Sequence, residues 1–353
     1  MSAPLQYSGP GQVAQSIGSG PVVYIYQAEG ENGQVKLEVN QKRTRRSTAI
    51  HGYLKSTLED ETARISLTPF DSWAILPALF PAYLGITTAG TNGTAGVLAI
   101  GTRPHDIAAG AANGTAPTTI WTPDGRLYRV VRTAITKPPG MRLGVGQPLF
   151  TGMEITGLAD PAMTLGQGGE LLDTAAHVAG TGTATGITES GASNPAAGGT
   201  FPAYGVPDFV NGYWSGAWGA VAGFTTLDAE DGWSLEIDAK YSPLISQKRT
   251  YHYKLDSIEF MVKARLTGPT HTQLAAKALA FAAGAVLTQG SATDLILTGP
   301  SSKTVTLKDC TVYLEGQGFE FGGTKLATGE VAFVTKLDFT SSATPNPGLV
   351  FSA

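Results

Sequence analysis

The sequence has little of what a metal centre, a disulfide scaffold or a membrane anchor requires. Its single cysteine, Cys310, excludes an intrachain disulfide and a multi-cysteine zinc site, and we interpret it as a small core residue on a strand. The five histidines are scattered, without the i, i+4 spacing of a zinc-binding helix. No apolar run reaches the ~18 residues of a membrane span, and the N-terminus lacks the features of a signal peptide. We therefore expect no metal and no membrane contact.

Catalytic patterns are also scarce. His105-Asp106 has no evident nucleophile, and the glycines from Gly180 to Gly186 lack the spacing and the flanking strand of a dinucleotide-binding turn. Glu59-Asp60-Glu61 has no aromatic neighbours that would raise a pKa, so we interpret it as a solvated turn. The sequence predicts no catalytic and no cofactor-binding residue, and we expect a protein that is not an enzyme. A β-rich carbohydrate-active enzyme is a remote alternative, because Trp and Tyr recur between Phe201 and Trp233.

Charged residues make up only 15% of the chain, with a formal net charge of −4, so the chain lacks the basic footprint of a general nucleic-acid binder. Two basic groups stand out, in loops that are predicted to be similar. The first comprises Lys42, Arg43, Arg45 and Arg46, and the second comprises Lys248 and Arg249. Each group is either a solvated hairpin tip or a contact loop between subunits. Its acidic partners on another subunit would then come from Glu29, Glu31, Asp228, Glu230 or Asp231. A contact with nucleic acid is a weaker alternative, because the patch is short.

What the chain does have is glycine, 45 residues of it, together with short alternating apolar segments, a pattern that favours strands and turns over helices. Residues 22–27 and 34–40 are predicted strands, followed by a basic loop over 41–47 and further strands over 50–58 and 63–67. The segment from Thr68 to Asp71 is typical of a helix start, and predicts a short helix over 71–80.

The most informative feature is an internal repeat that is far too long for a solenoid. Leu37-Glu38-Val39-Asn40 is answered by Leu235-Glu236-Ile237-Asp238, and Arg64 to Thr68 by Lys263 to Thr267, at offsets of 198 and 199 residues. A helix-like run follows each copy, up to Phe80 and Phe281. The closing segments Ile120–Gly157 and Ile296–Phe339 match as well.

The repeat predicts two similar β-rich domains in tandem, each with one short helix. We expect an N-terminal arm over residues 1–20, copy 1 over 21–160 with an insertion at 87–117, a Gly/Thr/Ala-rich linker over 161–200, copy 2 over 201–340, and a C-terminal tail over 341–353. Leu349 to Phe351 make the tail a candidate segment for docking on a neighbour.

Two β-rich domains with these paired blocks resemble the tail tube proteins of long-tailed bacteriophages, over most of the chain. The resemblance implies that each domain is a β-sandwich of the tube fold with a short flanking α-helix, and that its strands join those of neighbours into an inner barrel. It also implies a virion protein of the tail, made in the host cytoplasm. Most members of that family have one tube fold and form hexameric rings, so two folds imply a homotrimer with pseudo-sixfold symmetry, stacked into a tube. Other tail proteins would be its partners, and DNA would be a non-specific passing cargo. Alternatives are a distal tail or baseplate ring, a tail terminator, and a capsid or decoration protein.

Overall fold

The structure is a computed structural model. It describes residues 12–16, 22–26, 35–50, 52–69, 73, 76, 118–121, 127–130, 133–157, 172–173, 212–219, 224–246, 249–267, 293–314, 330–335 and 348–352. Within this part of the chain the fold is mainly β, and every strand pairing is antiparallel. The only helical element with defined bounds there is a 3-10 turn, η6 (Pro300–Ser302).

The first half of the chain, residues 12–173, supplies two sheets of order β10-β6-β5-β1-β2 and β3-β4-β9-β7. The strands of the first sheet are β1 (Gln12–Ser16), β2 (Val22–Tyr26), β5 (Thr118–Trp121), β6 (Leu127–Val130) and β10 (Leu172–Asp173). The strands of the second sheet are β3 (Lys36–Thr48), β4 (Gly52–Leu67), β7 (Thr133–Lys137) and β9 (Met153–Gly157).

The second half, residues 212–352, supplies sheets of order β11-β15-β16-β19 and β17-β18-β14-β13-β8; β8 comes from the first half, and β12 pairs with β14. The strands of the smaller sheet are β11 (Ser215–Trp218), β15 (Leu295–Thr298), β16 (Thr304–Leu307) and β19 (Leu349–Ser352). Those of the larger sheet are β8 (Met141–Leu143), β12 (Asp228–Ala229), β13 (Trp233–Ser246), β14 (Arg249–Thr267), β17 (Thr311–Leu314) and β18 (Glu330–Thr335).

The two halves repeat one strand order. The order β3-β4-β9-β7 recurs as β13-β14-β18-β17, and β10-β6-β5-β1 recurs as β19-β16-β15-β11. The long hairpins also share their irregularities: pairing shifts after Lys42 and Arg46 in β3, and after Lys240 and Leu244 in β13. Lys42 to Lys240 and Arg46 to Leu244 both span 198 residues. β-Bulges re-aim and twist a strand at defined places, so two matched bulges are a specific likeness.

Alternation along the long strands builds the core. Ala63, Ile65 and Leu67 of β4 are buried, as are Phe260 and Val262 of β14. Because side chains alternate across a strand, each long hairpin buries one face against the other sheet of its half. In the first half a 2.8 Å hydrogen bond joins the buried hydroxyls of Thr118 on β5 and Thr133 on β7. Trp218 of β11 meets Phe333 of β18 edge-on in the second half, at 5.7 Å between centroids. Each half is thus sandwich-like.

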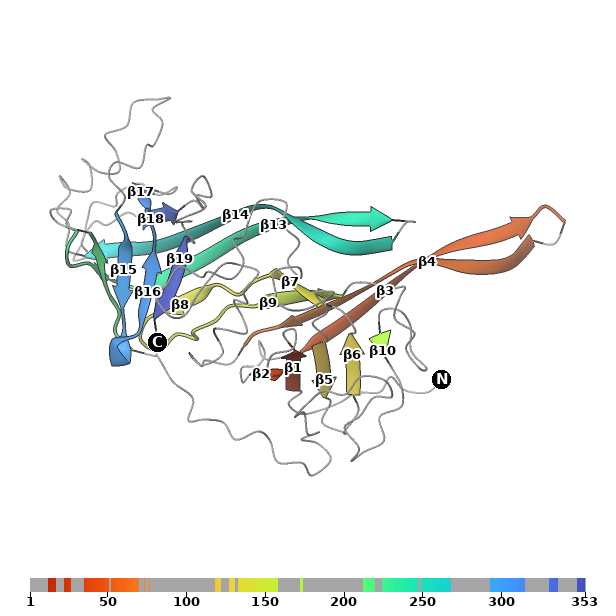
Figure 1. Cartoon of the computed structure of the whole chain (residues 1–353), viewed down its shortest axis with the longest axis horizontal. Helices are drawn as coiled ribbons and strands as arrows, with labels where there is room; N and C mark the ends of the chain where they lie inside the picture. The colour runs from red at the N-terminus through yellow and green to blue at the C-terminus, as the bar shows by residue number, and fades with distance from the viewer. Residues whose placement is uncertain are drawn as a thin grey trace, which may run out of the picture.

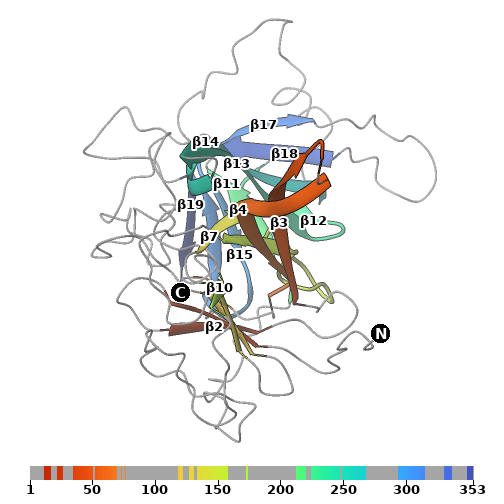
Figure 2. The same cartoon turned by 90° about the vertical axis from the view of Figure 1, so that its right-hand side faces the viewer.

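Both hairpins run along the long axis of the molecule and point the same way (Figure 1). The β3–β4 hairpin extends farther, well beyond the body. When the molecule is viewed along its long axis, the tip of the β3–β4 hairpin faces the viewer (Figure 2). Strands β17 and β18 lie on one side of the tip, and strands β2 and β10 lie on the other.

Several boundaries differ from those predicted. The expected basic loop over 41–47 is wrong, because these residues continue β3. The two strands predicted over 50–58 and 63–67 are replaced by the one strand β4, which begins at Gly52. The hairpin leaves the core here, so neither face needs apolar residues. The expected docking of Leu349 to Phe351 on a neighbour is also wrong: these residues are buried in β19, which pairs with β16 of the same chain. Cys310 is buried as predicted, directly before β17 rather than on a strand.

Other predictions fall largely outside the described residues. Of the expected first helix only Trp73 and Leu76 are described, both buried and in helical conformation; the matching run in the second half lies outside. The insertion 87–117 and all of the linker 161–200 except β10 lie outside as well. Gln12–Ser16, within the expected arm, forms β1 and pairs with β2 and β5.

Candidate assembly surfaces

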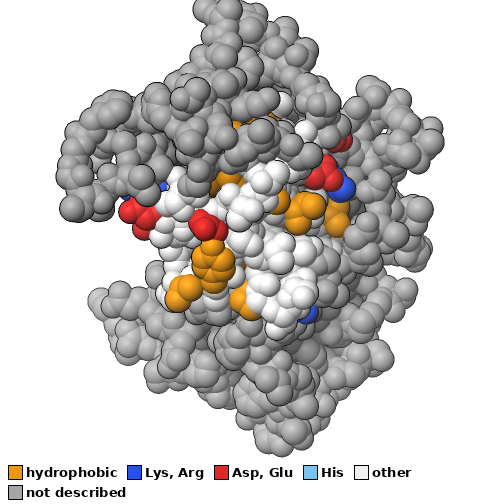
Figure 3. All heavy atoms as spheres, turned by 90° about the vertical axis from the view of Figure 1, so that its left-hand side faces the viewer, with side chains coloured by type: hydrophobic (Ala, Val, Ile, Leu, Met, Phe, Trp, Pro, Cys, Tyr) orange, Lys and Arg blue, Asp and Glu red, His pale blue; other side chains and the backbone are white. Residues whose placement is uncertain are grey.

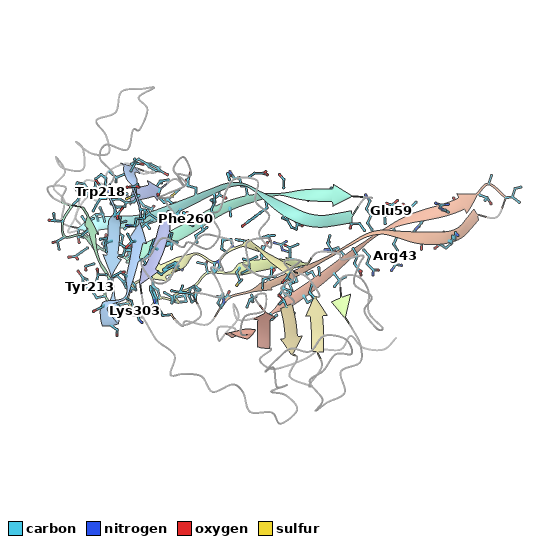
Figure 4. All side chains as sticks on the ribbon, viewed as in Figure 1. Arg43, Glu59, Tyr213, Trp218, Phe260 and Lys303 are labelled. Atoms are coloured by element: carbon cyan, nitrogen blue, oxygen red, sulfur yellow. The ribbon has the colours of Figure 1, made fainter. Side chains whose placement is uncertain are left out.

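The basic residues singled out from the sequence lie on the projecting β3–β4 hairpin. Lys42, Arg43, Arg45 and Arg46 are all exposed on β3. Figure 4 shows Arg43 beside Glu59, in the inner part of the projecting β3–β4 hairpin. Arg249 begins β14 at the tip of the second hairpin, and Lys248 lies outside the described residues. The structure therefore places the two predicted groups on two separate hairpins that point the same way.

Charge segregates along each hairpin. Between Arg43 and Leu58 the chain has four basic residues and no acidic one, and between Tyr241 and Leu255 it has three basic residues and no acidic one. The carboxylates predicted to form a solvated turn, Glu59 to Glu61, instead lie within β4 at the inner end of the basic segment. Within both of these segments the sequence thus supplies positive charge and no negative charge.

Few internal contacts hold the basic side chains. The Arg43 guanidinium donates to the Gln41 side-chain carbonyl at 2.6 Å, and the Gln41 amide donates to Glu61 at 2.8 Å. No ion pair between described residues involves Arg45 or Arg46. Large apolar side chains are exposed beside them: Ile50 is 87% exposed and Tyr53 60%. Exposed apolar groups ringed by charge are typical of interaction sites.

The opposite end of the molecule carries acidic and apolar side chains. The turn from Asp228 to Gly232 joins β12 to β13 and exposes the Glu230 and Asp231 carboxylates. Tyr213 donates a hydrogen bond from its hydroxyl to Asp228, and this bond raises the pKa of the tyrosine. Figure 3 shows this face, where acidic and hydrophobic side chains stand out and basic ones are few.

The loop after β8 completes this end. Val145 is 74% exposed and Tyr213 62%. The Gln147 amide donates to the backbone carbonyl of Asp231 at 2.9 Å, which ties the loop to the acidic turn. Basic neighbours moderate the charge without removing it: Arg265 Nη1 is 4.0 Å from an Asp231 carboxylate oxygen. The carboxylates of this turn were predicted from the sequence as contact residues, but Val145 was not. A single valine indicates a contact surface only once the structure shows that it is exposed.

A third surface is the junction between the halves. β8 of the first half pairs with the start of β13, through Leu143 with Trp233 and Met141 with Leu235. A Cβ atom on Gly140 would lie 2.7 Å from the Leu235 carbonyl oxygen. Buried side chains from both halves form a single core cluster.

Aromatic rings reinforce the junction. Trp73 of the first half lies 6.0 Å from Trp214 and 5.9 Å from Phe351, both of the second half, measured between ring centroids. Buried aromatic pairs of this kind add to the energy of area burial. The first half thus meets the second through β8, which pairs with β13, and through a shared core.

Two edge strands, β3 in the first half and β17 in the second, have a pairing partner on one side only among the described strands. β3 pairs only with β4, and β17 only with β18, among the described strands. β17 holds the place in the second half that β7 holds in the first, next to the junction. Exposed edges are a template for pairing with another chain.

A groove of about 420 Å³ lies where the two hairpins approach each other. It is lined by Asn40, Thr62, Ala63, Arg64, Thr136, Glu154, Thr156, Ala239, Tyr241 and Tyr253. Arg64 is ion-paired with Glu154, an interaction that raises the pKa of the arginine. Burial, with a smaller contribution from Asp60, raises the pKa of Tyr253. The lining offers no histidine, cysteine or lysine, so its chemistry is that of hydroxyls and one neutralised ion pair.

No known family model matches the sequence, and a search of the curated proteins finds no match. No helix in the described part of the chain is long and apolar enough to cross a membrane. In the same residues, no group of three or more His, Cys, Asp or Glu side chains is arranged to hold a metal ion.

Proposed function

We propose that this chain is a structural subunit that closes into a ring with copies of itself, and that the rings stack into the tail tube of a bacteriophage virion, through which DNA passes. The observation that carries this proposal is the repeated strand order, with two halves that already meet edge to edge. The matched bulges and buried faces support an ancestral duplication, in which each half is one tube-fold domain.

The geometry of the junction supports the proposed ring. The first half presents β8 to the start of β13, and β7 lies near a later part of the same strand. By the same relation the second half presents β17 to β3 of the next chain. Such a contact joins two different edges, and head-to-tail contacts of this kind close into rings when the rotation allows. Closure also removes the edges that would otherwise invite aggregation.

The expected ring is a homotrimer with pseudo-sixfold symmetry, because each chain contributes two similar domains. DNA would be a cargo rather than a ligand. A chain with a net charge of −4 does not hold nucleic acid through the release of counterions, so the duplex can slide. The basic residues of the hairpin tips would instead contact other subunits.

Cysteine cross-linking tests the ring edge directly, because the native thiol is buried. The double variant Val39→Cys/Thr311→Cys places one thiol on β3 and one on β17. A flexible bis-maleimide should then link chains into a covalent ladder that ends at three chains. Each single variant is a control: one thiol per chain cannot produce a ladder, because each link uses two different edges. A double variant that remains monomeric on a denaturing gel would contradict the proposed edge.

A further inference from the structure

We propose that the acidic end of the molecule is the receptor for the basic hairpin tips of a second copy of this chain in the adjacent ring. The acidic end is defined here by Val145, Tyr213, Asp228, Glu230 and Asp231. The inference rests on the proposed ring, and it adds the partner surface that the basic tips contact.

The first support is polarity along the long axis. Both hairpins point to the same end, and neither tip contains an acidic residue. Tyr213 lies at the other end of the molecule, hydrogen-bonded to Asp228 (Figure 4). A molecule with unlike charge at its two ends can stack head to tail, and such a contact generates an open filament rather than a closed pair.

The second support is the matched composition of the two surfaces. On the tip, exposed Ile50 and Tyr53 stand among basic side chains. On the receptor, exposed Val145 and Tyr213 stand beside acidic ones. Each surface thus has an apolar centre and a charged surround of opposite sign, which is the usual anatomy of a protein interface.

The third support is the state of the charges in the free chain. Glu230 and Asp231 are exposed, and Arg265 lies at the outer limit of an ion pair with Asp231, at 4.0 Å. Arg142, also exposed, belongs to the same end through β8. Complementary charge across an interface favours the correct partner and register and speeds encounter. The basic residues of the tips can therefore neutralise the Glu230 and Asp231 carboxylates more fully than Arg265 of the same chain does.

The experiment is a charge swap followed by electron microscopy and light scattering. Glu230→Arg/Asp231→Arg and Arg45→Glu/Arg46→Glu should each leave rings intact but raise the protein concentration needed for tube growth at least tenfold. Combining all four substitutions in one chain should restore much of the loss. The neutral variant Glu230→Gln/Asp231→Asn should give a smaller loss and a weaker dependence on salt, because no repulsion is introduced.

The control variant is Asp238→Arg/Glu259→Arg. These two residues lie opposite each other in the middle of the second hairpin, and the substitutions change the net charge by the same amount as at the receptor. Tube growth equal in the receptor variant and in the wild type would overturn this inference while leaving the ring proposal in place. A restored four-substitution variant with an unaffected control would support it. Wild-type protein that forms no ring at all would instead refute the proposed function.

Discussion

Gly232 lies at the junction between the halves, where both its backbone conformation and a close contact exclude a larger residue. Its φ is +79°, a left-handed conformation that favours glycine, and a Cβ atom there would lie 2.7 Å from the Leu143 carbonyl oxygen of β8. Gly232→Ala therefore has two costs. The left-handed conformation costs an alanine roughly 1–2 kcal/mol, and displacing a packed backbone costs about 1–3 kcal/mol more. We expect the free energy of unfolding to fall by about 2–5 kcal/mol.

Gly146 supplies the matched control. Its φ is +72°, and nothing lies within 4 Å of the position of its Cβ atom. Gly146→Ala should therefore lose only the conformational term, about 1–2 kcal/mol. Urea denaturation followed by tryptophan fluorescence measures both variants, and Trp233 next to the turn reports on the junction. Equal losses for the two variants would refute the close approach of β8 to this turn.

Three further predictions concern single side chains and the basic tip. The Tyr241 hydroxyl is buried without a hydrogen-bond partner among the described residues, and burial raises its pKa above the ordinary 10.0. Tyr241→Phe should leave stability unchanged or raise it by about 1 kcal/mol. Because the unfolded tyrosine loses its proton first, the wild type should lose stability as pH rises above 10 and the variant should lose less; an equal alkaline loss in urea melts would contradict the burial. Burial raises the pKa of the Cys310 thiol to about 12, so a disulfide reagent at pH 8 should react only on unfolding, and rapid reaction of the native protein would refute the core position. Arg43→Ala/Arg45→Ala/Arg46→Ala should change the free energy of unfolding by less than about 0.5 kcal/mol yet impair tube growth seen by light scattering, and unchanged growth would remove the tip from assembly.

The sequence predicted the buried strands better than the projecting ones. Near the core, apolar residues alternate along the strands around Leu37 and Ile65, and the structure packs both side chains against the core. Beyond Lys42 the hairpin has no core to face, so alternation stops and the chain looks like a polar loop. The continuation of β3 through Arg46 rests on cross-strand pairing instead, which no local pattern displays.

The register of the repeat shows another limit of sequence comparison. Sequence similarity aligns Leu67 of β4 with Leu266 of β14, an offset of 199 residues. At the matching bulges, Arg43 pairs with Leu58 in the first hairpin and Tyr241 with Leu255 in the second, so strand pairing aligns β4 with β14 at an offset of 197. A slip of two residues keeps every side chain on the same face of a sheet, so the hydrophobic pattern is the same in both registers. Only the hydrogen-bonded partner strand distinguishes them.

The charged residues of the candidate surfaces could be predicted from the sequence, but the exposed apolar residues beside them could not. The basic cluster and the carboxylates from Asp228 to Asp231 stand out in the sequence, and the structure places them at opposite ends of the molecule. Val145 and Ile50 carry no such signal, because an exposed aliphatic residue is recognised only when its surroundings are known. The same holds for β8, a three-residue strand whose role depends on β13, some ninety residues away.

The most direct test of the central claim is negative-stain electron microscopy of the purified protein, with native mass spectrometry of the assembled rings. The account predicts stacked rings with six-lobed end views and a ring mass of about 110 kDa, from three chains of 36.6 kDa. Isolated rings would favour a distal tail, baseplate or terminator protein, and closed shells a capsid or decoration protein. A chain that stays monomeric at high concentration would contradict the account.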